Sequence, residues 1–171
     1  LVETDGDMDK AVEYLRKRGM AAVEKRAGRE ANEGVVMSYL HPGSRLGVLV
    51  EINCETDFVA RTDDFQTFAR DVAMHIAAEG PVAVSREDLE LAVIEKEKEI
   101  YLEQARNEGK PAHIAEKIVT GRLDKYFQEV CLMEQAFVKD PDKTIQDLFT
   151  EWTAKIGEKI TMDQTKHRLQ A

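Results

Sequence analysis

The stretch LGVLVEINCETDFVAR, residues 46–61, joins an alternating segment to a short polar segment and then to an apolar pair. Its first half places four aliphatic residues on one side at a spacing of two, which predicts a β-strand: Leu46, Val48, Val50 and Ile52. Residues 54–57 are polar and leave the predicted sheet, and Phe58 follows directly. An aromatic ring on such a connection is either folded back onto the core or presented to a partner. The first is commoner for an isolated phenylalanine, but it leaves the acidic neighbour Asp57 unexplained, so both stay open.

A β-hairpin is predicted over residues 35–53, with the alternating segment as its second strand. Residues 35–40 also alternate, and His41-Pro42-Gly43-Ser44 has the composition of a turn. Gly47 inside the second strand predicts a close approach by another element. Because a two-stranded hairpin is not stable alone, a third strand must come from the C-terminal end or from another subunit.

A short N-terminal helix is predicted between Asp9, a capping residue, and Gly19, a helix stop. Its inward side would carry Ala11, Val12 and Leu15. Residues 20–33 are rich in alanine and charge, and we interpret them as a mobile or loosely helical linker.

Further helices follow from periodicity and caps. One spans 63–79, begins at Asp63 and buries a stripe made of Phe65, Phe68, Ala69, Val72 and Ile76. A long helix over 86–107 begins after Ser85, and Gly109-Lys110-Pro111 separates it from helices over 112–120 and 122–133, which predicts a protruding helical hairpin. Residues 140–143 are expected to form a loop. The last helix runs from Thr144 to Gly157, and residues 158–171 have no clear period.

Composition narrows the function classes. The 171-residue chain has a net charge of -9, which argues against nucleic acid as the main partner because phosphate binding needs a basic surface. The two cysteines, Cys54 and Cys131, suggest buried free thiols in a reducing compartment. There is no apolar run long enough to cross a membrane and no signal peptide. Because the chain begins at Leu1, we expect its natural N-terminus to be missing, so a targeting segment stays open.

Catalytic signatures are missing from the sequence. The four histidines are scattered singly, without metal-ligand spacing, and there is no Cys-x-x-Cys pair, so no metal site is expected. There is no phosphate-binding glycine loop, so no bound nucleotide or other cofactor is expected. We interpret the chain as a non-enzyme; a nucleophile pair of Cys54 or Cys131 with His75 is the rival interpretation.

Residues 51–61, EINCETDFVAR, resemble the signature of bacterial-type elongation factor Ts, the nucleotide exchange factor of elongation factor Tu. Six further stretches resemble the same family in the same order, and together they extend the resemblance from Leu1 to about Ile160: AVEYLRKRG (11–19), AMHIAA (73–78), NEGKP (107–111), IAEKI (114–118), GRL (121–123) and QAFVKD (135–140).

The resemblance implies an α+β fold, in which a small antiparallel sheet packs with helices and a helical excursion over about 86–133 projects from it. Residues 1–19 would be the remnant of an N-terminal helical module similar to ubiquitin-associated domains (UBA-like), residues 20–33 a linker, and residues 34–171 the core and dimerisation domain. The family's closing basic-aromatic strand is replaced here by residues 161–171, which leaves the third strand and any dimer contact it makes open.

The resemblance also implies a function. The chain would bind GDP-loaded and nucleotide-free elongation factor Tu, with Phe58 wedged near the Mg²⁺ site of that GTPase, so that Mg²⁺ is displaced and GDP released during protein biosynthesis. Asp57 would make a polar contact there, and Thr56 and Val59 would hold the shape of the turn. Met74 and His75 lie in a stretch that matches a second contact.

Only one core is found in the chain, so the resemblance implies the short form of the family, a homodimer that binds two GTPases. A cytoplasmic location is expected, with an organellar form left open by the missing N-terminus. No direct binding of nucleic acid or membrane is expected. The alternative function is a helical adaptor without exchange activity.

Overall fold

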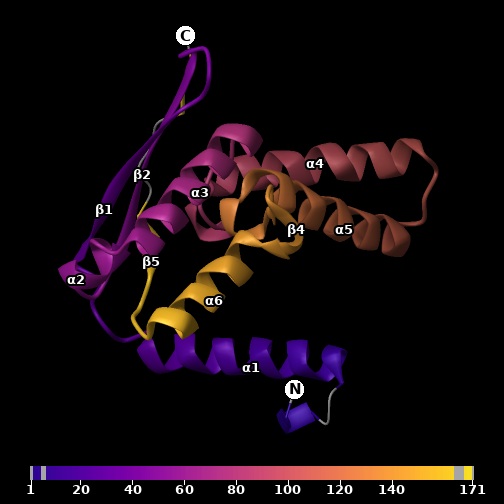
Figure 1. The fold of residues 1–171 in the computed structure, drawn as a ribbon. Coiled ribbons are helices and arrows are strands. Elements are labelled where there is room, and N and C mark those ends of the chain that lie inside the picture. The colour runs from indigo at the N-terminus through magenta and orange to yellow at the C-terminus, as the bar shows by residue number, and fades with distance from the viewer. Residues whose placement is uncertain (1, 5–6, 164–167, 171) are drawn as a thin grey trace.

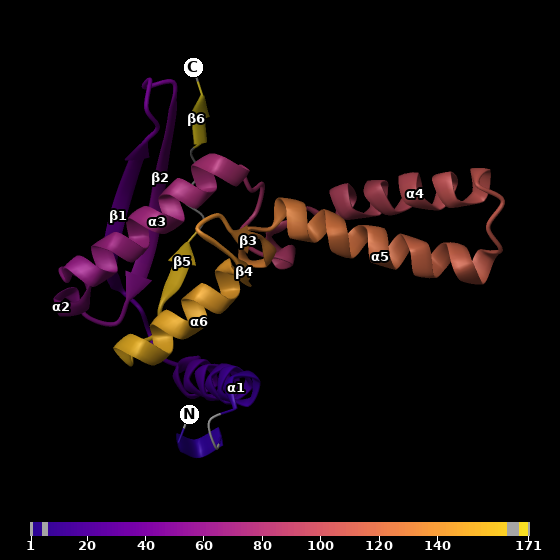
Figure 2. The same cartoon turned by 45° about the vertical axis from the view of Figure 1, so that its right-hand side comes forward.

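The computed structural model describes residues 2–4, 7–163 and 168–170, with helices packed on one side of a small antiparallel sheet (Figures 1 and 2). The sheet contains β1 (Glu33–Leu40), β2 (Leu46–Cys54), β5 (Thr161–Asp163) and β6 (Arg168–Gln170). β1 pairs with β2 along one edge, and β5 and β6 pair with successive parts of the other edge of β2. The predicted hairpin and the α+β class are confirmed, and the third strand comes from the C-terminal part of the same chain.

Strand register decides which side chains enter the core. Met37 pairs with Val50 and Val35 with Ile52, so these residues share one face, and the face is buried. Helix α3 (Asp63–Glu79) lies across that face, and helix α6 (Ile145–Ile156) packs against α3 (Figure 2). Phe68 joins the two helices, because its ring centroid lies 5.0 Å from that of Phe149. The predicted apolar stripe of α3 is therefore the centre of the core.

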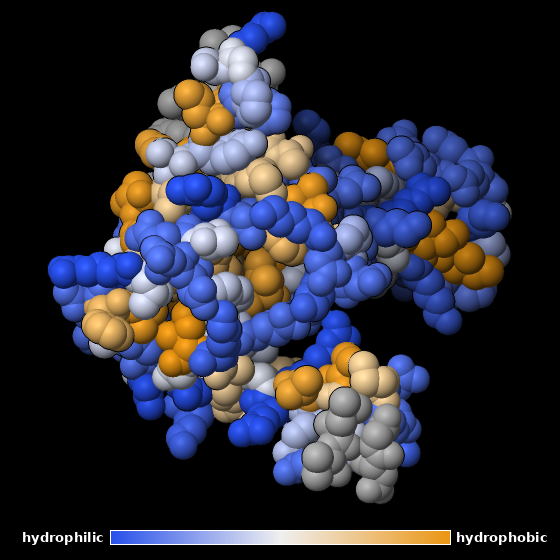
Figure 3. All heavy atoms as spheres, in the orientation of Figure 1, coloured by the Kyte–Doolittle hydropathy of each residue, from blue (hydrophilic) through white to orange (hydrophobic). Residues whose placement is uncertain are grey.

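A helical hairpin projects from this core, as predicted (Figure 1). It consists of α4 (Leu91–Asn107), preceded by the 3-10 turn η2 (Arg86–Asp88), and α5 (Ala112–Val130). The separate helices predicted over 112–120 and 122–133 are wrong, since α5 is continuous through Gly121, which has open space around it. Hydrophilic surface covers most of this arm (Figure 3).

The segment after the arm contains a second, two-stranded sheet. The 3-10 turn η3 (Leu132–Glu134) leads into β3 (Ala136–Phe137), which pairs with β4 (Asp140–Thr144). The loop predicted over 140–143 is therefore wrong, because those residues form a strand. The predicted ends of α6 are confirmed: Thr144 accepts a hydrogen bond from the Asp147 amide at 3.1 Å, and Gly157 has a left-handed conformation with φ 82°.

Helix α1 (Met8–Arg26), which follows the 3-10 turn η1 (Val2–Thr4), differs from its prediction at both ends. Asp7 rather than Asp9 is the N-cap, and the helix runs past Gly19 for seven more residues. Gly19 is buried against α6, where an added Cβ would lie 3.0 Å from Cγ2 of Thr150, so its small size serves helix packing rather than termination. The predicted inward residues Val12 and Leu15 are exposed, and Ala11 is buried.

The close backbone approach predicted at Gly47 occurs at Gly34 instead. A Cβ on Gly34 would overlap the carbonyl oxygen of Ile52 and lie 2.6 Å from Oδ1 of Asn53. A Cβ on Gly47 would make only ordinary contacts, the nearest at 3.6 Å from Leu40. Because Gly34 pairs with Asn53, the crowded position lies at the end of β2 that leads into the polar turn.

Candidate functional site

The connection between β2 and α3 presents an aromatic ring to solvent. Strand β2 ends at the buried Cys54, and a single helical turn, α2 (Asp57–Ala60), follows. Thr56 is the N-cap of α2, and its hydroxyl accepts a hydrogen bond from the Val59 amide at 3.4 Å. The Phe58 side chain is 79% exposed, so the interpretation that this ring folds back onto the core is wrong.

Charged groups flank the ring on the same turn. Asp57 is exposed, and its carboxylate forms an ion pair with Arg61 one turn later, with 2.9 Å between the charged atoms. Both side chains are more than half exposed, so solvent screens this pair and leaves it free to exchange partners. Thr56, Asp57, Phe58 and Val59 are therefore together on one turn, with Thr56, Asp57 and Phe58 at the surface.

A carboxylate from another part of the chain holds the base of this turn. Oε2 of Glu158 accepts hydrogen bonds from the amides of Glu55 and Thr56, each at 3.1 Å. Oε1 of the same group accepts a hydrogen bond from the Thr56 hydroxyl at 2.7 Å. Sequence reasoning missed Glu158, because only the fold brings it beside a turn about a hundred residues earlier.

Glu55 makes the reciprocal contact. Its Oε1 accepts a hydrogen bond from the Lys159 amide at 2.6 Å, and its Oε2 pairs with Arg29 at 3.1 Å. The hydrogen bond from the Lys159 amide, assisted by Arg29, lowers the pKa of Glu55 below its ordinary value. The Lys159 ammonium in turn donates to the carbonyls of Ala27 and Arg29, both at 2.8 Å. The turn is thus tied to the segment that follows α1 as well as to the segment that follows α6.

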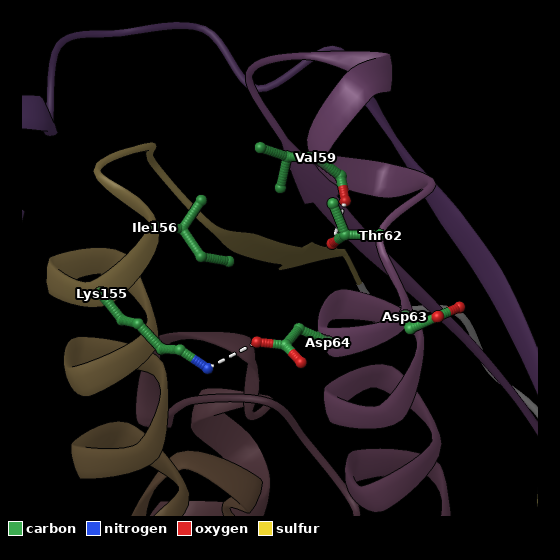
Figure 4. A pocket seen from close by; sticks show the side chains of 6 residues that line it. All are labelled: Val59, Thr62, Asp63, Asp64, Lys155 and Ile156. Atoms are coloured by element: carbon green, nitrogen blue, oxygen red, sulfur yellow. Dashed lines mark hydrogen bonds and ion pairs between the residues drawn. The ribbon is translucent and has the colours of Figure 1, made fainter.

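The inner side of the turn rests on the core. Ala60 is buried, and Val59 is half-buried against the main hydrophobic cluster. Thr62, rather than the predicted Asp63, caps α3, and its hydroxyl donates to the Val59 carbonyl at 2.8 Å. Beside Val59 lies an open hollow of about 420 Å³, where Val59 and Ile156 face each other (Figure 4). Lys155 and Asp64 close one end of it with a 2.8 Å ion pair.

The second predicted contact stretch lies on α3, and its two residues differ in exposure. Met74 is half-buried, whereas His75 is 0% exposed. Nδ1 of His75 accepts a hydrogen bond from the Val138 amide at 3.3 Å, and Nε2 lies 3.0 Å from Oε1 of Gln135. Because Nδ1 accepts, the neutral ring carries its proton on Nε2 and donates it to Gln135. The structure therefore places His75 inside the molecule and does not bring it to the Phe58 turn.

The two thiols are buried and engaged with their surroundings rather than with histidine. The Cys54 thiol donates to the Thr56 carbonyl at 3.2 Å, and burial raises its pKa above the ordinary value. Burial raises the pKa of Cys131 to about 11. A thiol that stays protonated at neutral pH is a poor nucleophile, and both His75 nitrogens are already hydrogen-bonded elsewhere. The described residues therefore give the nucleophile-pair interpretation no support.

The described residues contain neither a metal-binding cluster nor a membrane-spanning helix. Among them, no group of three histidine, cysteine or acidic side chains could hold a metal ion. None of the described helices combines the length and apolar character needed to span a bilayer.

Comparison of the sequence with known proteins places this chain in a family. The family model described as Elongation factor TS matches residues 10–166. The chain is 62% identical over 162 residues to elongation factor Ts of Carboxydothermus hydrogenoformans. The aligned region covers 95% of this chain and 75% of that protein. It is 56% identical to elongation factor Ts of Geobacter sulfurreducens with the same coverage, and 56% identical to that of Moorella thermoacetica with 80% of the relative covered. The family match spans β1, β2 and β5, the exposed turn and the helical arm, and the chain belongs to the elongation factor Ts family.

Proposed function

We propose that this chain is a guanine nucleotide exchange factor that binds GDP-loaded elongation factor Tu and accelerates the release of GDP. Family membership supports the partner, and the observation that carries the mechanism is the exposed Phe58 ring on a turn held by Glu158. In this proposal the chain is not an enzyme and holds no cofactor, since exchange needs no covalent step. A cytoplasmic location belongs to the same proposal.

The physical basis is linkage. A GTPase holds GDP through backbone amides, a lysine and Mg²⁺ on the diphosphate. A protein that accelerates release must bind the nucleotide-free state more tightly than the loaded state, and GDP then weakens its binding by the same factor. Phe58 would insert apolar surface beside the partner's Mg²⁺ site and Asp57 would make a polar contact there. Loss of the ion would loosen the diphosphate.

Rigidity makes the turn suitable for this task. A flexible loop would lose conformational entropy on binding, whereas a turn already fixed by three hydrogen bonds to Glu158 loses little. Thr56 and Val59 contribute shape rather than contact area: Thr56 caps α2, and Val59 rests on the core.

For the second contact, we propose that Met74 touches the GTPase directly and that His75 acts through the backbone it holds. Met74 has part of its surface free, whereas His75 is enclosed. The His75 ring fixes the Val138 amide, and the Val138 side chain next to it is exposed. Met74 and Val138 are thus the surface groups beside His75.

We further propose a homodimer formed through the outer face of the sheet. Opposite the core side, β1 and β2 present Val36, 65% exposed, together with Leu40 and Leu49. A second copy of the same face would bury these residues in a two-fold arrangement. Sedimentation at micromolar concentration should give twice the monomer mass. Val36→Asp should shift it to the monomer; a monomeric parent chain would contradict the dimer.

The domain division is also a proposal. Residues 34–171 would be the core and dimerisation domain, residues 20–33 a linker whose first part continues α1, and residues 1–19 the remnant of a UBA-like module. One side of α1 is uncovered, with Met8, Val12 and Leu15 exposed at helical spacing, as expected of a helix that a further helix would cover.

The test is release of a fluorescent GDP analogue from purified elongation factor Tu. The observed release rate should rise with the concentration of this chain and saturate, and added free GDP should weaken the complex. A complex that forms without any change in release rate would instead favour the adaptor alternative. No complex at all would contradict the partner.

A further inference from the structure

We infer that Glu158 is a positioning residue for nucleotide exchange, an inference that rests on the proposed function. Its carboxylate fixes the direction in which the α2 turn presents Phe58, without itself touching the GTPase. The inference depends on how the turn is held, which can be followed one contact at a time.

The turn cannot hold its own shape. A four-residue helix is a single turn, and the first turn of any helix is unfavourable to form alone. The exposed Phe58 ring provides little packing of its own. The backbone that leads into α2 must therefore be fixed by contacts with other parts of the chain. The amides of Glu55 and Thr56 provide such contacts, because both donate hydrogen bonds to Oε2 of Glu158. Hydrogen bonds to a charged carboxylate are about twice as strong as those between neutral groups.

Glu158 also orients the cap. The Thr56 hydroxyl donates to Oε1 of Glu158 at 2.7 Å, which leaves a lone pair of the hydroxyl oxygen aimed at the Val59 amide. One carboxylate thus sets both the backbone before α2 and the hydroxyl that begins it. Phe58 lies between Thr56 and Val59, the two residues that this hydroxyl joins, so its direction follows from them.

The backbone on both sides of Glu158 is itself held by hydrogen bonds. Before it, the Gly157 carbonyl accepts a hydrogen bond from Nε of Arg26 at 2.8 Å. After it, the Lys159 amide donates to Glu55, which closes a reciprocal pair between the two turns. A group fixed in this way can hold a neighbour in place, whereas a surface carboxylate on a free side chain cannot.

The experiment compares GDP release from elongation factor Tu for the parent chain and for Glu158→Ala, Glu158→Gln and Glu151→Ala. Glu158→Ala should lower the accelerated release rate by about tenfold, since three charge-assisted hydrogen bonds are lost. Glu158→Gln keeps the shape and one carbonyl acceptor, so its loss should be smaller, about threefold. Glu151→Ala, which removes another carboxylate near the C-terminal half of α6, should change nothing.

A double variant separates positioning from a merely structural role. If Glu158 acts through the ring, Glu158→Ala should lower the release rate by less than about twofold once Phe58→Ala is present, because coupled residues are not additive. A full tenfold further loss in the Phe58→Ala background would overturn the inference.

Amide hydrogen exchange provides a readout that does not depend on the partner. In Glu158→Ala the amides of Glu55 and Thr56 should exchange at least about tenfold faster, while the Val138 amide, held by His75, keeps its parent rate. Unchanged protection at both positions would overturn the inference. A parent chain that fails to accelerate release overturns the proposed function, whereas an active parent with a fully active Glu158→Ala variant overturns only the inference about Glu158.

Discussion

Phe58 and His75 both lie in stretches that resemble partner-contacting parts of the family, but the first ring is 79% exposed and the second 0% exposed. The Phe58 ring projects from a turn that is held from behind by Glu158 and Glu55. The His75 ring is enclosed, and each of its nitrogens is hydrogen-bonded to the chain. In the proposed function the two residues therefore act differently: Phe58 by contact with the partner, His75 by shaping the backbone beneath a contact.

The hydrogen bonds around His75 run in one direction. The Val138 amide donates to Nδ1, Nε2 donates to Gln135, and the Gln135 side-chain amide donates to the Glu129 carbonyl at 2.7 Å. This series joins the β3–β4 hairpin to the end of α5 through α3. Removing the His75 ring from this series should therefore lower the free energy of unfolding more than it lowers nucleotide exchange activity.

His75→Ala should produce the largest effect, a loss of about 3 kcal/mol in the free energy of unfolding. The variant leaves a cavity and two polar groups, of Gln135 and Val138, without their partner. Denaturant titration of the variant and the parent chain measures this loss in the free energy of unfolding. A variant that keeps parental stability but loses exchange activity would contradict the distinction between His75 and Phe58, because it would make His75 a contact residue.

Phe58→Ala should give the reverse pattern. Affinity for nucleotide-free elongation factor Tu should fall by about 2 kcal/mol or more, roughly thirtyfold, because an exposed aromatic anchor is removed. The free energy of unfolding should change by less than about 0.5 kcal/mol, as for other surface substitutions. Val82→Ala is the matched control, since Val82 is 74% exposed and lies beyond the end of α3, in the segment that precedes the arm. Calorimetry measures the change in affinity, and denaturant titration measures the change in the free energy of unfolding. A clearly destabilised Phe58→Ala variant would contradict the assignment of Phe58 as an exposed residue.

Mild acid, between about pH 8 and pH 5, should weaken the packing around His75. Burial lowers the pKa of His75 below its ordinary value, so the unfolded chain takes up this proton at a higher pH than the folded chain does. The contribution of His75 to stability is complete above the unfolded pKa. It decreases as the pH falls from there through the folded pKa, by at most about 1.4 kcal/mol per pH unit.

Protonation of Nδ1 would also place two donors, the ring and the Val138 amide, against each other. The measurement is the difference between the stability curves of the parent chain and the His75→Gln variant from pH 8 to pH 5 (about three units, the range in which histidine titrates). Parallel curves would show that His75 does not titrate differently on folding.

Asp64→Asn should have the smallest effect, a change of less than about 0.5 kcal/mol in the free energy of unfolding. The Lys155–Asp64 pair at the hollow beside Val59 is well exposed on both sides, and such pairs are screened by solvent. GDP release should also stay at the parental rate. A clear loss of exchange activity would mean that this hollow belongs to the surface that contacts the GTPase. The contact surface would then extend beyond the Phe58 turn.

Local sequence patterns were enough to identify the family and several of the elements. Alternation over residues 46–52 identified β2, the apolar stripe identified α3, and the EINCETDFVAR motif identified the turn. These signals are local, since side-chain spacing and capping depend on neighbours a few residues apart. The same locality explains the errors: glycines at positions 19 and 121 read as helix ends, although both lie inside helices.

The residues that hold the turn, and the residues left accessible at the surface, became apparent from the packing of distant segments. Glu158 reaches the amides of Glu55 and Thr56 because β5 pairs with β2 and thereby brings the end of α6 beside the end of β2. His75 is enclosed because η3 and the β3–β4 hairpin cover its side of α3. Burial and long-range hydrogen bonds arise from packing between segments far apart in the chain, and no local spacing in the sequence encodes them.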